Sequence, residues 1–385
     1  MTATQPIRIA QTGETDARLA AQAFHAAVAQ ADMALVIFFC SSDYDLGVLG
    51  AEMHRLFGGT PVIGCTGAGE FGPIGYCEHG ISGASFASGA FTVVTQVLDQ
   101  LQGFEIARGQ AWAQGMLRKL QEKAPDADAH NSFAFLLIDG LSVREETVAR
   151  SFQHTLGKLP MFGGSAGDGL RFQRTHVYHD GQFQTDAVVL ALVTTSLPYK
   201  LFKTQHFVAT EERVVVTQAD ADKRIVREIN GRPAAQEYAR LLGIDVADLG
   251  PTCFATSPLV VLIDGANYVR AIQKQNPDHS LTFYCAIEEG LVLRMAKGVD
   301  MLANMEQAFA AIRADLGQPQ LVLGCDCVLR SLELTQAGNK ERAAQIFRDN
   351  NAIGFATYGE QFGGVHVNQT LAGIAIAGAG ENQDA

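Results

Sequence analysis

One histidine of the ten lies in a segment where a β-strand would place it beside aromatic side chains. The alternation of a strand puts Phe202, Thr204 and His206 on one face, and Phe207 follows directly. Histidine is the commonest protein ligand of metals and also binds haem iron. His206 is therefore a candidate metal or haem ligand, and a hydrogen-bonded core histidine is the alternative that the same pattern allows.

A second histidine belongs to a polar stripe near the C-terminus. If residues 366–377 form one strand, His366, Asn368 and Thr370 share a face, while valine and leucine occupy the other. Polar side chains on one face of an otherwise apolar strand indicate a lined pocket. His366 is thus a second candidate ligand, with the same structural alternative.

Several enzyme motifs are absent from the sequence. There is no dinucleotide-binding or P-loop glycine pattern. The turn around Ser165 lacks the spacing of a nucleophile elbow. Cys325 and Cys327 form a C-x-C pair without a second pair at zinc-ligand spacing. We therefore expect a binding protein and not an enzyme.

Composition narrows the class of protein further. The 385 residues carry a net charge of −12, which disfavours a nucleic-acid partner. Hydrophobic residues make up 47% and charged residues 18%, enough for buried cores. The sequence shows no signal peptide and no run of about 18 apolar residues that could cross a membrane. The seven cysteines, an odd number mostly in apolar runs, suit a reducing compartment. We expect a soluble, cytoplasmic protein.

Helix and strand patterns alternate strictly in the first half and less strictly in the second. We expect an α/β and an α+β part, each with a mixed sheet and flanking helices. The divisions are a lead-in with the first helix at 1–30, an N-terminal domain at 31–210, a C-terminal domain at 211–378 and a tail at 379–385. A single strand at 199–208 would lead out of the N-terminal domain. No tandem repeat is visible.

Glycine-rich turns follow two of the expected strands, at 64–72 and 163–169. These turns, with three further motifs, resemble the FIST family of sensory proteins. The matching segments are 64–70, 162–168, 228–234, 357–361 and 368–370. The resemblance spans about 34–378 and implies an N-terminal and a C-terminal FIST domain.

Within that family, residues 202–207 and 358–370 look like the bacterial haem proteins that sense nitric oxide. The resemblance implies a haem b cofactor and regulation of a histidine kinase or a cyclic-di-GMP enzyme, and through it of biofilms. It implies His206 or His366 as the iron ligand, with His179 as a third candidate, and leaves open whether two histidines coordinate together. Phe202, Phe207 and Asn368 would line the haem site. No C-x-x-C-H is present, so the haem would be held non-covalently.

An alternative is a FIST sensor of a small metabolite, such as an amino acid, without haem. Backbone N–H groups of the glycine turns could hold a carboxylate, and Glu70 and Asp168 could orient an amine. This alternative predicts a colourless protein with a pocket at the turns. The turns could also do no more than connect strands to helices. For either sensor, a homodimer is the expected assembly.

Overall fold

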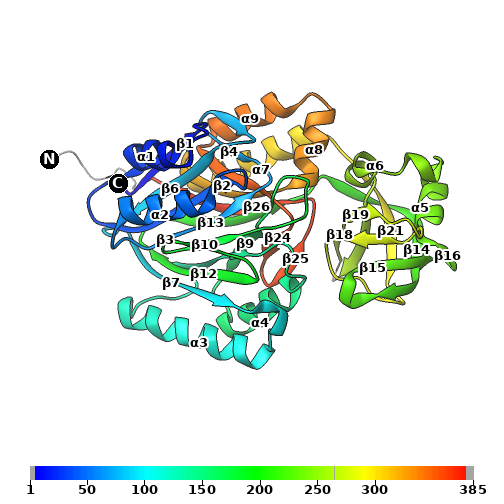
Figure 1. The fold of residues 1–385 in the computed structure, drawn as a ribbon, viewed down its shortest axis with the longest axis horizontal. Coiled ribbons are helices and arrows are strands. Elements are labelled where there is room, and N and C mark those ends of the chain that lie inside the picture. The colour runs from blue at the N-terminus through cyan, green and yellow to red at the C-terminus, as the bar shows by residue number, and fades with distance from the viewer. Residues whose placement is uncertain (1–4, 264, 379–385) are drawn as a thin grey trace.

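The chain forms a body of three sheets and a smaller lobe that carries a fourth (Figure 1). The computed structural model describes residues 5–263 and 265–378. The tail expected at 379–385 lies outside the described residues. The expected fold class, mixed sheets with flanking helices, is confirmed.

Each sheet of the body has six strands. Its central strands are apolar runs that are buried on both faces, as in β2, which the sequence predicts at 34–40. In order across the first sheet, the strands are β1 (Ile7–Thr12), β6 (Ile81–Ala87), β2 (Met33–Ser41), β3 (Val62–Gly67), β10 (Val177–His179) and β11 (Gln182–Gln184). The second sheet contains β7 (Phe91–Asp99), β12 (Ala187–Thr195), β8 (Ser132–Ile138), β9 (Met161–Ser165), β24 (Glu360–Phe362) and β25 (Val365–Val367). The third contains β13 (Tyr199–Thr204), β26 (Leu371–Ala377), β22 (Pro319–Cys327), β23 (Ala352–Thr357), β4 (Glu70–Gly72) and β5 (Gly75–Cys77).

The three sheets share one topology. In each, one central pair is parallel (β2 with β3, β8 with β9, β22 with β23), and every other neighbouring pair is antiparallel. The last two strands of each sheet are a hairpin donated by another unit of the chain. The hairpin after β3 joins the third sheet, the hairpin after β9 joins the first, and the hairpin after β23 joins the second. The body is thus three cyclically interlocked copies of one unit, a repeat that was not visible in the sequence.

Glycine occupies an equivalent position in all three parallel pairs. A Cβ atom at Gly64, Gly163 or Gly354 would lie 2.3, 2.0 or 1.9 Å from a carbonyl oxygen of the neighbouring strand. Backbone bonds also close a ring between the turns that follow. The N–H groups of Ala68, Gly167 and Tyr358 donate to the carbonyls of Ala356, Thr66 and Ser165. The close approach of strands explains the glycines, and the ring fixes the turns against one another.

Pairs or triplets of helices cover the outer face of each sheet (Figure 1), and the inner faces share one apolar core. In the first helix, Asp16 accepts hydrogen bonds from the N–H groups of Arg18 and Leu19, and apolar residues recur at helical spacing. The helices are α1 (Ala17–Val28) and α2 (Leu46–Phe57); η1 (Leu101–Gly103), α3 (Ile106–Lys123) and α4 (Glu145–Leu156); and α7 (Met301–Leu316), α8 (Val328–Gln336) and α9 (Lys340–Asp349).

The lobe is inserted into the third unit, between β13 and α7. Its sheet has a core of its own and packs against the body through Phe207, Leu329 and Tyr358, among others. The predicted domain boundary at 210 falls within its first strand. The strands are β14 (Phe207–Asp220), β15 (Ile225–Ile229), β16 (Arg232–Pro233), β17 (Leu259–Ile263), β18 (Ala266–Arg270), β19 (Ile272–Gln275), β20 (Leu281–Phe283) and β21 (Val292–Gly298). The helices are η2 (Ala221–Lys223), α5 (Ala234–Leu242), η3 (Val246–Asp248) and α6 (Pro251–Thr256).

Two strands predicted as continuous are interrupted, so both predictions are wrong. The strand expected at 199–208 breaks at Gln205 and His206, where the chain crosses from body to lobe. The strand expected at 366–377 breaks at 368–370, and Gln369 has a φ of 52°. Alternation of side chains therefore does not place His366, Asn368 and Thr370 on one strand face.

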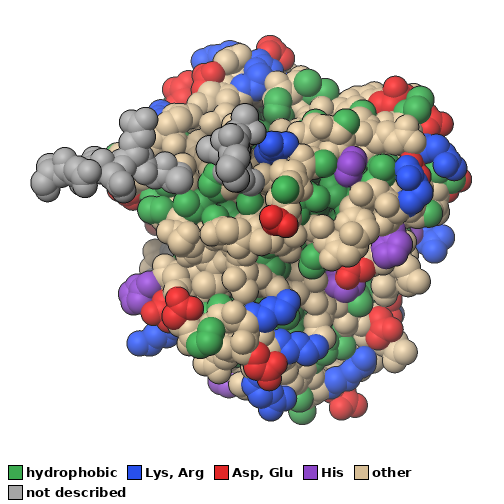
Figure 2. Space-filling model, turned by 90° about the vertical axis from the view of Figure 1, so that its left-hand side faces the viewer, with side chains coloured by type: hydrophobic (Ala, Val, Ile, Leu, Met, Phe, Trp, Pro, Cys, Tyr) green, Lys and Arg blue, Asp and Glu red, His purple; other side chains and the backbone are tan. Residues whose placement is uncertain are grey.

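Acidic and basic side chains are interspersed over the face of the body opposite the lobe (Figure 2). No helix in the described part of the chain has both the length and the apolar character that a membrane crossing requires.

Candidate ligand-binding site

His366 lies on β25, at the edge of the second sheet, and is 2% exposed. Its Nδ1 accepts a hydrogen bond of 3.1 Å from Gln361 Nε2, which also donates to Ser165 Oγ over 2.9 Å. Its Nε2 is buried without a hydrogen-bond partner among the described residues. Burial lowers the pKa of the ring, so His366 is neutral at pH 7.

Other buried polar atoms around His366 also lack partners. They are Gln361 Oε1 and both amide atoms of Asn368, within the residues that the structure describes. The next residue, Gln369, donates to the Ala255 carbonyl and also leaves its Oε1 without a partner there. Gly359 packs on the ring, because a Cβ atom there would lie 2.2 Å from His366 Cε1 and 2.7 Å from Nε2. Buried polar groups are nearly always satisfied, so such a cluster indicates a place where water or a ligand completes the bonding. We call Gln361, His366, Asn368 and Gln369 the hairpin cluster.

A cavity of about 740 Å³ opens beside His366, within the usual size range of ligand sites. Residues of α3, α4, β25 and the lobe line it, and we call it the junction cavity. Its lining combines apolar side chains, including Ile106, Leu291 and Val365, with the basic side chains of Arg150, His154 and Arg270.

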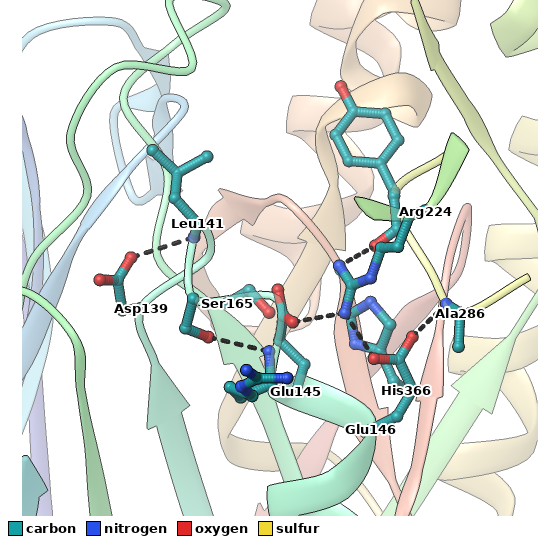
Figure 3. A network of polar contacts seen from close by, with 12 residues as sticks. Asp139, Leu141, Glu145, Glu146, Ser165, Arg224, Ala286 and His366 are labelled. Atoms are coloured by element: carbon teal, nitrogen blue, oxygen red, sulfur yellow. Dashed lines mark hydrogen bonds and ion pairs between the residues drawn. The ribbon is translucent and has the colours of Figure 1, made fainter. Parts of the chain in front are cut away.

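An ion-pair network crosses between lobe and body at the same place (Figure 3). Arg224 of the lobe donates to Glu145 and Glu146 of α4, at 2.6 and 2.5 Å, and to the Tyr284 carbonyl. Glu146 also accepts the N–H of Ala286 from the lobe. A movement of the lobe against α4 would therefore strain contacts next to His366.

His206 differs from His366 in having both ring nitrogens bonded. Arg330 donates to Nδ1 over 3.1 Å, and Nε2 donates to Glu333 over 2.9 Å. Arg330 also pairs with Asp326 at 2.6 Å, with both side chains buried. The carbonyl of His206 accepts the N–H of Val299, which lies on the returning chain. The residue thus occupies the crossing between body and lobe.

The remaining predicted site residues lie in different places. His179 is in the first sheet, with Nε2 3.3 Å from Thr95 Oγ1. Phe202 packs against Phe309 of α7, and Phe207 lies against the His206 ring with centroids 4.1 Å apart. Asn368 belongs to the hairpin cluster. The structure thus brings predicted residues together in two separate places, His366 with Asn368 and His206 with Phe207.

The two glycine-rich turns meet at a second cavity of about 420 Å³, the turn cavity. Gly67–Gly69 and Asp168–Arg171 line it. The Asp168 carboxylate accepts the N–H groups of Phe172, Gln173 and Arg174, and Tyr358 donates to it. Glu70 lies behind Gly67, fully buried, with neither carboxylate oxygen bonded within the described residues. Burial raises its pKa well above the ordinary value.

Within the described residues, no three His, Cys, Asp or Glu side chains are grouped to hold a metal ion by themselves. A haem iron, by contrast, needs a single axial nitrogen from the protein. Sequence reasoning missed Gln361, Glu146, Arg224 and Arg270. The Glu145–Glu146 pair at the start of a helix could have pointed to the ion-pair network. Acidic residues are common at that position because they complement the helix dipole, so the pair alone does not indicate a site.

Comparison with known proteins identifies the family of this chain. Residues 34–232 match the FIST N domain, and residues 234–363 match the FIST C domain. The chain belongs to the FIST family. FIST domains are sensor domains of signal transduction, and this FIST protein carries both. The junction cavity lies where residues of the two matched regions meet.

An uncharacterized protein of Methanocaldococcus jannaschii is 24% identical over 278 residues, which is 63% of this chain and 52% of that protein. The chain thus spans about half that relative's length. Two cyanuric acid hydrolase structures, one from A. caulinodans, align over nearly the whole of both chains. Their sequence identities are 10% and 11%, with TM-scores of 0.39 and 0.34. Similarity at this level carries no argument about the function of this chain.

Proposed function

We propose that this FIST protein is a haem-based nitric oxide sensor that holds haem b non-covalently in the junction cavity, with His366 as the iron ligand. The observation that carries the proposal is the buried Nε2 of His366, which has no partner among the described residues, on a residue that lines a cavity of ligand size. Because Gly359 packs against this edge of the ring, iron would reach Nε2 only after the ring or the Gly359 turn moves. His206 is the weaker candidate, because ligation would break its bond to Glu333 or to Arg330.

The residues around His366 would suit a histidine that holds iron. A metal-bound imidazole usually donates its other N–H to a neighbouring acceptor. The Gln361 amide nitrogen lies within 3.1 Å of both His366 Nδ1 and Ser165 Oγ. If the amide group rotated by 180°, its oxygen would take that place and could accept hydrogen bonds from both groups. The ring proton would then stay on Nδ1, leaving the Nε2 lone pair free. Bound ferrous haem would supply the iron to which nitric oxide binds.

The position of the cavity supports a sensory role. A ligand can switch a protein only if it binds two conformations with different affinity. A ligand in the junction cavity would contact α4 of the body and also the lobe, so its affinity would depend on the lobe position. The proposal includes a cytoplasmic protein, no catalytic activity of its own, and a histidine kinase or cyclic-di-GMP enzyme as partner.

The test is an absorption spectrum of the protein reconstituted with haemin, reduced, and exposed to nitric oxide. The expected result is a sharp Soret band at one haem per chain that shifts with nitric oxide. A haemin spectrum no different from that of free or loosely associated haemin would contradict the proposal.

A second candidate is a sensor of a small metabolite such as an amino acid. The observation in its favour is the turn cavity, which both glycine turns line and behind which Glu70 is unpartnered within the described residues. The test is a thermal-shift screen of amino acids on colourless protein, repeated on Glu70→Gln. A stabilising amino acid whose effect depends on Glu70 would favour this function over haem.

A further inference from the structure

Two arginines of the junction cavity have no carboxylate partner in the described part of the chain. Arg270, on β18 of the lobe, is half-buried, and its Nε is buried without a hydrogen bond. Arg150, on α4 of the body, is exposed at the cavity rim. Neither arginine forms an ion pair within the described residues.

Nearby acids do not neutralise these arginines. Glu146 is the acid of the cavity wall on α4, and its carboxylate is already bonded to Arg224 and to the N–H of Ala286. Glu288 of the lobe is exposed and forms no ion pair within the described residues. The chain as a whole is strongly acidic, at −12. Two guanidinium groups left without carboxylates at one cavity therefore indicate an anionic ligand.

We propose that Arg270 and Arg150 form a carboxylate clamp that binds two carboxylates of the ligand, one from the lobe and one from the body. A guanidinium group presents a planar fork of N–H donors that matches a carboxylate in bidentate geometry. The apolar part of the ligand then lies against Ile106, Leu291 and Val365. The clamp rests on the proposed function, under which its targets are the two propionates of haem.

The clamp gives the ligand a bridging role. Arg270 moves with the lobe and Arg150 with α4, so a ligand held by both ties the two parts together. Without the ligand, the Arg224 ion pairs and the apolar contact around Phe207 hold them. Ligand binding should therefore reduce hydrogen exchange in β18, and the reduction should depend on both arginines.

The test compares haemin with haemin dimethyl ester, whose propionates are uncharged, by absorption titration. The proteins are wild type, Arg150→Gln, Arg270→Gln and the double variant; Arg118→Gln on the exposed side of α3 is the matched control. Wild type should bind the ester about tenfold or more weakly than haemin. The double variant should bind both equally weakly and lose the protection of β18 on haemin binding, while Arg118→Gln behaves as wild type.

Two failures can be told apart. If wild type binds haemin and its ester with equal affinity, and the arginine variants bind both as tightly as wild type does, the clamp is wrong while the proposed haem site is supported. If neither compound binds in a defined ratio to folded protein, as judged by circular dichroism, the proposed function fails and the clamp fails with it.

Discussion

His206 and His366 are both buried and both predicted as ligands. His206 lies in the interruption between β13 and β14, and His366 lies in β25, two residues before the interruption at 368–370. Arg330 and Glu333 occupy the two ring nitrogens of His206. Gln361 occupies only one nitrogen of His366. Burial and histidine chemistry alone therefore do not distinguish a structural histidine from a ligand. The presence or absence of a partner on the second ring nitrogen distinguishes them. By this criterion His206 is the structural histidine at the crossing between body and lobe, and His366 is the candidate ligand at the junction cavity.

The largest effect on stability should follow from removing the partner that holds His206. Arg330→Met leaves Asp326 buried without its cation and removes the donor to Nδ1. Loss of one member of a buried ion pair costs about 3–5 kcal/mol of unfolding free energy. Urea unfolding measures it, with Arg118→Met on exposed α3 as control. A loss under about 1 kcal/mol would contradict a structural role for this network.

A smaller effect should follow from crowding His366. Gly359→Ala would place a methyl group 2.2 Å from His366 Cε1, so the ring must shift. Overpacking of this kind costs about 1–3 kcal/mol, and we expect haemin affinity to fall as well. Gly103→Ala is the control, since nothing lies within 4 Å of its Cβ position. Unchanged stability and haemin binding in Gly359→Ala would show that the ring is not held as described.

The smallest effect is a pH dependence that the two histidines share. Burial lowers the pKa of both, so below the ordinary value of about 6.5 the unfolded chain binds protons that the folded chain refuses. The contribution of the two rings should be nil above that pH, and it should lower stability as the pH drops below it, by up to about 1.4 kcal/mol per pH unit for each ring.

Unfolding curves of His206→Gln and His366→Gln at a series of pH values check this prediction. Each variant should lose part of the acid-side slope, whereas His130→Gln in an exposed loop should keep it. If stability falls with decreasing pH equally steeply in wild type and in both variants, the two rings bind protons in the folded protein as readily as in the unfolded chain, which would contradict the prediction.

Much of the fold could be predicted from the sequence, because long apolar runs and helical spacing carry it. The strand at 132–138 and the helices near 17–28 and 46–57 lie where their patterns place them. The interruptions at 205–206 and 368–370 could not be predicted, because alternation of side chains continues through them while the backbone turns.

The threefold repeat was missed for a different reason. The three units share their pattern of strand pairing and a few equivalent residues, such as Gly64, Gly163 and Gly354. Long segments of unequal length separate these residues in the sequence, so no fixed period is visible. The site was predicted in part, as His366 and Asn368. Which nitrogens are engaged depends on residues far along the chain, since His206 is 127 positions from Glu333.

The most direct test of the account is a haemin titration of His206→Gln beside His366→Gln, with circular dichroism to confirm that both are folded. Glutamine keeps a polar side chain of similar size but offers no imidazole to iron. We predict that His206→Gln keeps the Soret band and its shift with nitric oxide, and that His366→Gln loses both. The reverse outcome, with haem lost in folded His206→Gln and kept in His366→Gln, would contradict the assignment of the ligand to the junction cavity.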